Sequence, residues 1–201
     1  KSETYMIVTA DKRASIAAKN ILDKGGSAID AVIAAQMVLN VVEPQSSGIG
    51  GGGFLIYFDA NKKESLAFDG RERAPIKYHS KVFLRKDGNK KGFIEAISGG
   101  LAVGVPSILS MLEMAHKKYG LLDWKNLFNE AINYAGNGFI VGERLSKLSK
   151  KAPHLKNQTE TNQYFHIDNG GLQSGQELMN YDLASTFKII RDKGSSGLLN
   201  G

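Results

Sequence analysis

The sequence has no cysteine among its 201 residues, which excludes disulfides, thiolate metal sites and cysteine nucleophiles. It also has no run approaching the roughly 18 to 20 consecutive apolar residues that a membrane-spanning helix needs, so we expect no membrane span in this chain. Its first residues are polar, unlike the apolar region of a signal peptide. Because the chain opens on Lys1 and not on Met, we expect that it has been cut or trimmed, and an export signal removed earlier is neither visible nor excluded.

Long clusters of one charge are also missing, although the formal net charge is +6. The lysines are dispersed, and the densest cluster, residues 147–151, contains no aromatic residue that could stack on a base. We therefore expect a solvated surface and no nucleic-acid partner. With 42% hydrophobic and 23% charged residues, the composition is that of a globular protein, and residues 1–201 are predicted to form a single domain with no separate second domain.

Hydrophobic periodicity predicts a mixture of helices and strands. One helix is predicted to start at Ser27, which with Asp30 forms a capping box, and to be buried on nearly all sides. Residues from the second strand of the hairpin to about 89 are predicted to be irregular, residues 152–175 to be a polar linker, and residues 195–201 to lack a closing element. The predicted elements are a strand at 5–9, helices at 12–24 and 27–42, hairpin strands at 54–58 and 64–68, and helices at 106–119, 124–135, 143–150 and 181–193.

Five glycines stand in the run from Val42 to Phe54. Glycine loses more conformational entropy on folding than any other residue, so the run predicts a sharp turn, positive φ angles or a close approach of the backbone; the alternative is an ordinary surface turn. Gly48, Gly50 and Gly53 match G-x-G-x-x-G, but a dinucleotide site needs a strand, the glycine turn and then a helix. Here a helix precedes the run and a strand follows it, so we expect no nucleotide cofactor.

A second concentrated segment, residues 68–75, follows the hairpin directly and reads F-D-G-R-E-R-A-P. Arg71 at the end of a strand, fixed by Asp69 or Glu72, is suited to bind a carboxylate with both branches of its guanidinium. The alternatives are a surface ion pair, and a turn in which Asp69 bonds the backbone and Gly70 supplies the permissive dihedral angle.

No complete catalytic apparatus is visible. The G-x-S-x-G motif of a serine nucleophile is absent, and the histidines lack the spacing of a zinc site, so we expect no metal and no other cofactor. The four histidines are His79, His116, His154 and His166.

Several ordered motifs, taken together, resemble the γ-glutamyltranspeptidase (glutathione hydrolase) family, specifically the N-terminal part of its large subunit. The resemblance covers nearly the whole chain, and the glycine run combined with D-G-R-E is its most specific part. The matching segments are 25–31, 42–54, 69–75, 103–106, 119–120 and 183–186.

The resemblance implies an α/β (α+β) fold, namely part of the four-layer αββα sandwich of N-terminal nucleophile hydrolases, incomplete in this chain. It implies a precursor that cleaves itself to expose a threonine, which accepts the γ-glutamyl group and passes it to water, an amino acid or a peptide. That threonine lies beyond residue 201 in the family, so this chain holds no catalytic residue and is expected to be inactive alone. The family's usual export suggests a periplasmic or secreted protein.

The resemblance also implies that Arg71 binds the α-carboxylate of a glutathione-like γ-glutamyl substrate. Arg73 replaces the small hydroxyl residue common at its position, and we interpret it as a surface residue or one that affects the site indirectly. The glycine run is interpreted as structural, allowing the helix at 27–42 to lie against the sheet that carries Arg71. The expected protein partners are the rest of the large subunit and the small subunit. Two alternatives stay open: a non-catalytic binding domain, and a related hydrolase of poly-γ-glutamate or β-lactam acyl groups.

Overall fold

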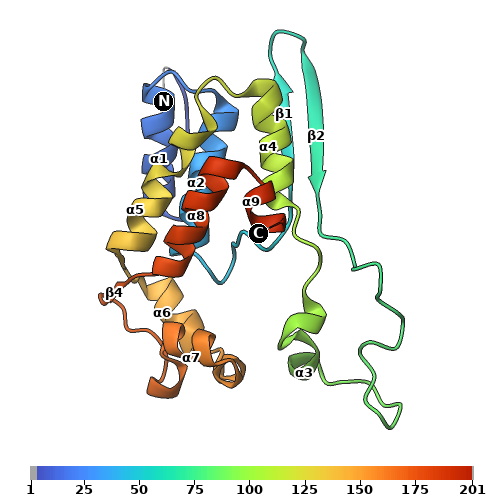
Figure 1. The fold of residues 1–201 in the computed structure, drawn as a ribbon. Helices are drawn as coiled ribbons and strands as arrows, with labels where there is room; N and C mark the ends of the chain where they lie inside the picture. Colours follow the sequence, from blue (N-terminus) through green and yellow to red (C-terminus); the bar gives the residue numbers. More distant parts are fainter. Residues whose placement is uncertain (1–3, 201) are drawn as a thin grey trace.

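The computed structural model describes residues 4–200 and contains a helical bundle with one long hairpin beside it (Figure 1). The mixed α/β class predicted from the sequence is confirmed. The elements, in order, are α1 (Lys12–Asp23), α2 (Ala28–Val42), β1 (Gly53–Asp59), β2 (Glu64–Gly70), α3 (Phe93–Ile97), the 3-10 helix η1 (Gly100–Ala102), α4 (Ile108–Tyr119), the 3-10 helix η2 (Trp124–Phe128), α5 (Asn129–Asn137), β3 (Phe139–Ile140), α6 (Glu143–Lys150), the 3-10 helix η3 (Pro153–Asn157), α7 (Thr159–Phe165), the 3-10 helix η4 (Ile167–Asn169), β4 (Glu177–Leu178), α8 (Tyr181–Lys193) and α9 (Ser196–Leu199).

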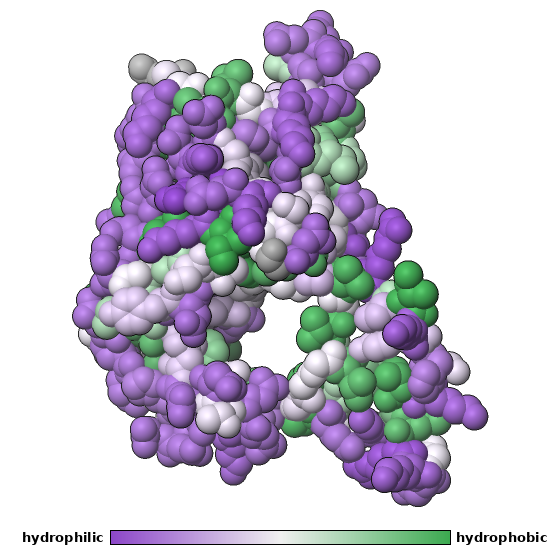
Figure 2. Space-filling model, viewed as in Figure 1, coloured by the Kyte–Doolittle hydropathy of each residue, from purple (hydrophilic) through white to green (hydrophobic). Residues whose placement is uncertain are grey.

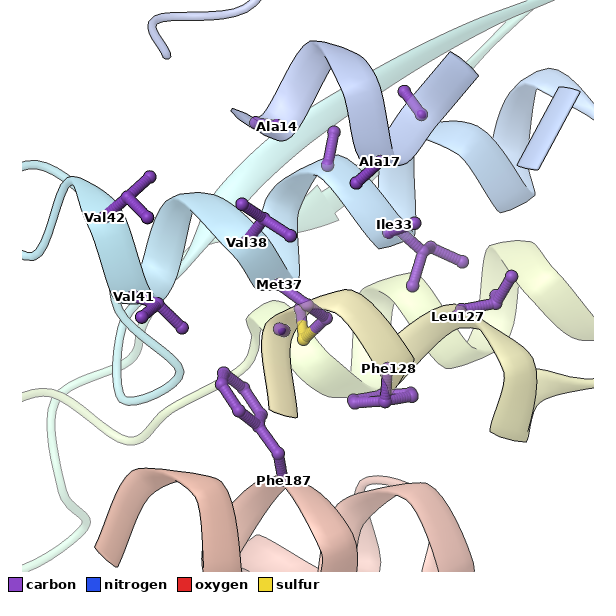
Figure 3. Packing of buried hydrophobic residues seen from close by; sticks show 14 of the residues in the cluster. Ala14, Ala17, Ile33, Met37, Val38, Val41, Val42, Leu127, Phe128 and Phe187 are labelled. Carbon is purple, nitrogen blue, oxygen red and sulfur yellow. The ribbon is translucent and has the colours of Figure 1, made fainter. Parts of the chain in front are cut away.

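Helix α2 forms the centre of the core and packs against α1, α4, α5 and η2. Ile33 and Met37 on α2 are fully buried, and Figure 3 shows them facing Leu127 and Phe128 of η2. The predicted capping box is confirmed, with Ser27 and Asp30 each accepting a bond from the other's backbone N–H. The predicted burial on nearly all sides also holds, apart from exposed positions such as Val32, which is 44% exposed.

Asp30 does more than cap its helix. Its side chain is completely buried, and one carboxylate oxygen also accepts bonds from the backbone N–H groups of Leu121 and Leu122, at 2.9 and 3.2 Å. His116 lies 3.5 Å from the other carboxylate oxygen. The start of α2 is thereby joined to the loop that follows α4, because a buried carboxylate must find hydrogen-bond donors.

The predicted hairpin is confirmed. It is antiparallel and runs from the pair Gly53 and Gly70 to the pair Asp59 and Glu64, so both strands are slightly longer than predicted. Its inner face packs on α4, where the rings of Tyr57 and Tyr119 are 4.5 Å apart. The glycine run therefore leads from α2 to a hairpin whose main helical partner is α4, whereas the sequence interpretation placed α2 there. The outer face of β1 carries three exposed apolar side chains: Phe54, Ile56 and Phe58.

The predicted strand at 5–9 is wrong. The exposure of its side chains does alternate as in a strand, with Met6 and Val8 exposed at 82% and 84% and Ile7 half-buried. A strand also needs a neighbour to complete its hydrogen-bond ladder. Both sheets in residues 4–200 are two-stranded, pairing β1 with β2 and β3 with β4, and neither includes this segment.

Other predictions fail at irregular segments. Residues 152–175 are no linker, because η3, α7 and η4 lie within them, and the tail from residue 195 contains the short helix α9. Helix α4 begins at Ile108, two residues after the predicted Pro106. The helix predicted at 124–135 is divided into η2 and α5.

Between β2 and α4 the chain runs far from the bundle, and α3 lies within this excursion (Figure 1). Figure 2 shows apolar residues gathered on the surface around α3, which include Phe93, Ile94 and Ile97. Within residues 4–200, none of the helices combines the length and apolar composition required to cross a bilayer.

Candidate functional site

Three segments far apart in the sequence meet at one end of the hairpin. They are the glycine run, the end of β2 and the residues that precede α4. The carbonyl of Gly51 accepts bonds from the backbone N–H groups of Ser107 and Ile108, both at 3.1 Å. The hydroxyl of Ser107 donates to the carbonyl of Gly70 at 2.6 Å. These bonds satisfy donors at the start of α4 that have no partner within the helix, and they fix the three segments together.

Close approach, and not positive φ, accounts for the middle of the glycine run. None of its five glycines is among the positive-φ residues of the described chain. A Cβ atom on Gly52 would lie 2.4 Å from the Gly70 carbonyl oxygen and 2.7 Å from a carboxylate oxygen of Glu72. Gly48 and Gly50, by contrast, have no heavy atom within 4 Å of such a Cβ. Only part of the run is therefore sterically required to be glycine. The predicted order of elements, with a helix before the run and a strand after it, is confirmed by α2 and β1.

The side chain of Glu72 occupies the space left by the missing side chain of Gly52. A Cβ atom on Gly104 would also lie 2.7 Å from the Cβ of Glu72, so the side chain is bounded on two sides by glycine. Its carboxylate lies 3.6 Å from Nε of Arg71. The glycine run is thus connected to Arg71 through Glu72, which the sequence did not indicate.

Arg71 lies immediately after β2, and its side chain is 72% exposed. Its backbone N–H donates to Oδ1 of Asp69 at 2.9 Å, so Asp69 is the turn residue and Glu72 the ion-pair partner. The ion pair involves Nε of Arg71, and neither of its two terminal nitrogens has a hydrogen-bond partner within residues 4–200. Gly70 does not supply a permissive dihedral angle; a Cβ there would lie 2.7 Å from the Cβ of Met111, so its absence allows α4 to pack closely.

Arg71 lines a cavity of about 400 Å³, a size typical of small-molecule sites. Arg73 lines the same cavity, and its carbonyl accepts a bond from the backbone N–H of Val105 at 2.8 Å. This pairing across 32 positions of sequence could not be predicted from local pattern. The cavity is lined by Asp69, Arg71, Glu72, Arg73, Val105 and Ser107.

A second cavity, of about 430 Å³, is also lined by Glu72, together with residues of the glycine run. A polar network borders it, in which Nε2 of Gln36 donates to Oδ1 of Asn40 at 3.0 Å and to Oγ of Ser47 at 2.6 Å. The bond between Gln36 and Asn40 shows that these two side chains share one face of α2. The described residues hold no cluster of three acidic or histidine side chains that could bind a metal.

Fold and site together define a mixed α/β chain in which an arginine at the end of a strand lines a cavity, with its two terminal nitrogens unpaired within residues 4–200. The γ-glutamyltranspeptidase family model matches residues 14–201. The chain belongs to this family. The resemblance of the motifs in the sequence is thereby confirmed.

Relatives and solved structures agree with this assignment. The chain is 39% identical over 196 residues to a glutathione hydrolase proenzyme of Bacillus subtilis (strain 168), with 98% of this chain and 33% of that protein covered. The crystal structure of Helicobacter pylori γ-glutamyltranspeptidase matches with a TM-score of 0.93 and 33% identity, over 100% of this chain and 58% of that one. The Bacillus anthracis transpeptidase CapD matches with a TM-score of 0.80 and 30% identity, over 100% of this chain and 62% of that one.

The chain spans about a third of the length of the curated relatives it matches. It is therefore part of a larger fold, as predicted.

Proposed function

We propose that the full-length protein is a γ-glutamyl hydrolase and transferase acting on glutathione-like compounds, and that Arg71 binds the α-carboxylate of the γ-glutamyl group. The observation that carries this proposal is the position of Arg71, which lines the cavity beside β2 and whose terminal nitrogens have no hydrogen-bond partner within residues 4–200. A guanidinium fork matches the two oxygens of a carboxylate. Family membership and the name of the B. subtilis relative support the choice of substrate.

The proposed reaction is acyl transfer in two steps. A threonine hydroxyl outside this chain attacks the γ-carbonyl carbon, the amide bond breaks, and the leaving amine takes up a proton. Water or the amine of an acceptor then attacks the resulting ester, a new bond forms to the γ-carbonyl, and the threonine hydroxyl is regenerated. Arg71 holds the opposite end of the glutamyl group, so that the γ-carbonyl is presented at a fixed distance from the cavity wall.

This chain supplies substrate binding and not the nucleophile. We propose that residues 1–201 form one domain of a large subunit and are inactive without the rest of that subunit and the small subunit. We also propose that the protein is made as a precursor that cleaves itself; the word "proenzyme" in the name of the B. subtilis relative supports synthesis as a precursor. We further propose that the mature protein is periplasmic or secreted.

The test is steady-state kinetics of the full-length protein with γ-glutamyl-4-nitroanilide. Arg71→Ala is expected to raise KM about 10- to 100-fold, because a hydrogen bond to a charged group is lost. The value of kcat should fall less, since the threonine is untouched.

The matched control is Arg85→Ala. Arg85 is also an exposed arginine paired with a nearby glutamate, Glu95, but it does not line the cavity. We expect its KM to equal that of the wild type. An unchanged KM for Arg71→Ala would contradict the assignment of this arginine, and a wild-type protein without turnover would contradict the proposed reaction.

A further inference from the structure

Arg73 is a second guanidinium in the cavity of Arg71, and nothing in residues 4–200 pairs with its side chain. The two carboxylates that line the cavity are already engaged. Asp69 accepts the backbone N–H of Arg71 at 2.9 Å, and Glu72 lies 3.6 Å from Nε of Arg71. The cavity therefore holds one arginine with an acidic partner and one without.

The backbone around Arg73 is fixed. Arg73 forms an antiparallel bridge with Val105, and the residues after Val105 are held by Gly51 at the start of α4. In extended backbone, residues two positions apart lie on the same face, which agrees with Arg71 and Arg73 lining one cavity. The backbone of Arg73 is thus anchored, and its side chain belongs to a residue that lines the same cavity as Arg71.

Two neighbouring guanidinium groups repel each other unless anions lie between or beside them. One carboxylate on Arg71 leaves Arg73 without a counter-charge. A substrate with two carboxylates would supply both, and a cavity of about 400 Å³ is large enough for a ligand of dipeptide size.

Resting on the proposed function, we propose that Arg73 binds a second carboxylate of the substrate, so that the site favours γ-glutamyl compounds with two or more carboxylates. The first carboxylate, on the γ-glutamyl group, binds Arg71. The second belongs either to the group that leaves or to the acceptor, and both present the same chemistry to Arg73.

The experiment measures selectivity in the full-length protein with two donors that differ by one carboxylate, γ-glutamyl-4-nitroanilide and γ-glutamyl-3-carboxy-4-nitroanilide. In Arg73→Gln, the KM ratio of the carboxylated to the neutral donor should rise about 5- to 10-fold over the wild type. Arg73→Lys keeps the charge but loses the planar guanidinium group, so its KM ratio should lie between those of the wild type and Arg73→Gln. Added salt should raise the wild-type ratio toward that of Arg73→Gln, because it screens the charge.

A second arm separates the two sources of the carboxylate. With the neutral donor, glycylglycine and glycylglycinamide are compared as acceptors. A rise of the glycylglycine KM relative to that of the amide in Arg73→Gln assigns the carboxylate to the acceptor. A rise in the donor ratio assigns it to the leaving group, and either result supports the proposal.

The control is Lys77→Gln, which removes a nearby exposed cation that does not line the cavity; its ratios should equal those of the wild type. Unchanged ratios in Arg73→Gln would overturn the proposal, and so would an equal rise of KM for all four compounds, which indicates a structural role. If Arg71→Ala still raises KM for both donors, the proposed function survives that failure. A wild-type protein without turnover overturns both.

Discussion

The core around α2 and the end of the hairpin around Arg71 are built in opposite ways. On α2, Ile33 is fully buried among side chains from other helices, as Figure 3 shows. On β1, Ile56 is 78% exposed, because its face of the hairpin has no cover among residues 4–200. Burying an apolar side chain contributes roughly 1.5 to 3 kcal/mol, so the core stabilises itself. The hairpin end is instead fixed by backbone hydrogen bonds and by the absence of Cβ atoms.

This difference suits the two regions to different roles. The core residues around α2 are already buried by other parts of this chain. Arg71 and the apolar outer face of the hairpin are exposed, and so are available to contact a substrate or another part of the protein. In the proposed full-length protein, the rest of the subunits would cover that face. Three experiments on stability, in order of decreasing expected effect, test how the regions are held together.

The largest difference in stability is expected between alanine substitutions of an isoleucine in the core and of an isoleucine on the hairpin. In the 201-residue chain, Ile33→Ala should lower the free energy of unfolding by about 2 to 5 kcal/mol, since it opens a cavity. Ile56→Ala should cost less than about 1 kcal/mol, since the side chain is already exposed. Urea unfolding measures both, and comparable losses would contradict the contrast. In the full-length protein, the cost of Ile56→Ala should increase if its face is covered.

A smaller effect is expected within the glycine run. Gly52→Ala would place a Cβ 2.4 Å from the Gly70 carbonyl oxygen, and the forced shift should cost about 1 to 3 kcal/mol. Gly50→Ala has open space and is the matched control, with a change within about 0.5 kcal/mol. Because Gly52 also borders Glu72, its substitution should raise KM in the full-length protein. Equal stability of the two variants would show that no part of the run is sterically required.

The smallest effect is pH-dependent and involves Glu113 on α4. Partial burial raises the pKa of this carboxyl. The Lys117 ammonium and the hydroxyl and N–H of Ser195 lower the pKa by more than burial raises it, so the net pKa is about 2. The folded-state pKa is thus below the unfolded value, so the stabilisation is present above about pH 4.5 and is lost as the pH falls toward 2. Solvent screening limits it to about 1 to 2 kcal/mol.

The measurement is the difference in unfolding free energy between the wild type and Glu113→Gln at pH 6 and near pH 2. The difference should be largest at pH 6 and nearly vanish near pH 2. A difference that is the same at both values would show that the contacts of Glu113 with Lys117 and Ser195 contribute nothing.

The parts of the fold that the sequence predicted correctly depend on local spacing. The capping box of Ser27 and Asp30 and the presence of the hairpin are decided by residues a few positions apart. The segment 5–9 was predicted wrongly because a strand depends on a hydrogen-bonded neighbour, which spacing within five residues cannot reveal.

The site was predictable in part for the same reason. The turn of Asp69 and the strand-end position of Arg71 are local features, and the sequence contains them. Two other features join segments about 20 to 50 positions apart. They are the packing of Glu72 between Gly52 and Gly104, and the backbone bridge between Arg73 and Val105. Such contacts arise only from the packing of α4 on the hairpin.

A crystal structure of the full-length protein with bound L-glutamate would show whether Arg71 binds the α-carboxylate. We expect this carboxylate within hydrogen-bond distance of both terminal nitrogens of Arg71, in the cavity that Arg73 also lines. A glutamate bound elsewhere, with the Arg71 fork still unoccupied, would contradict it.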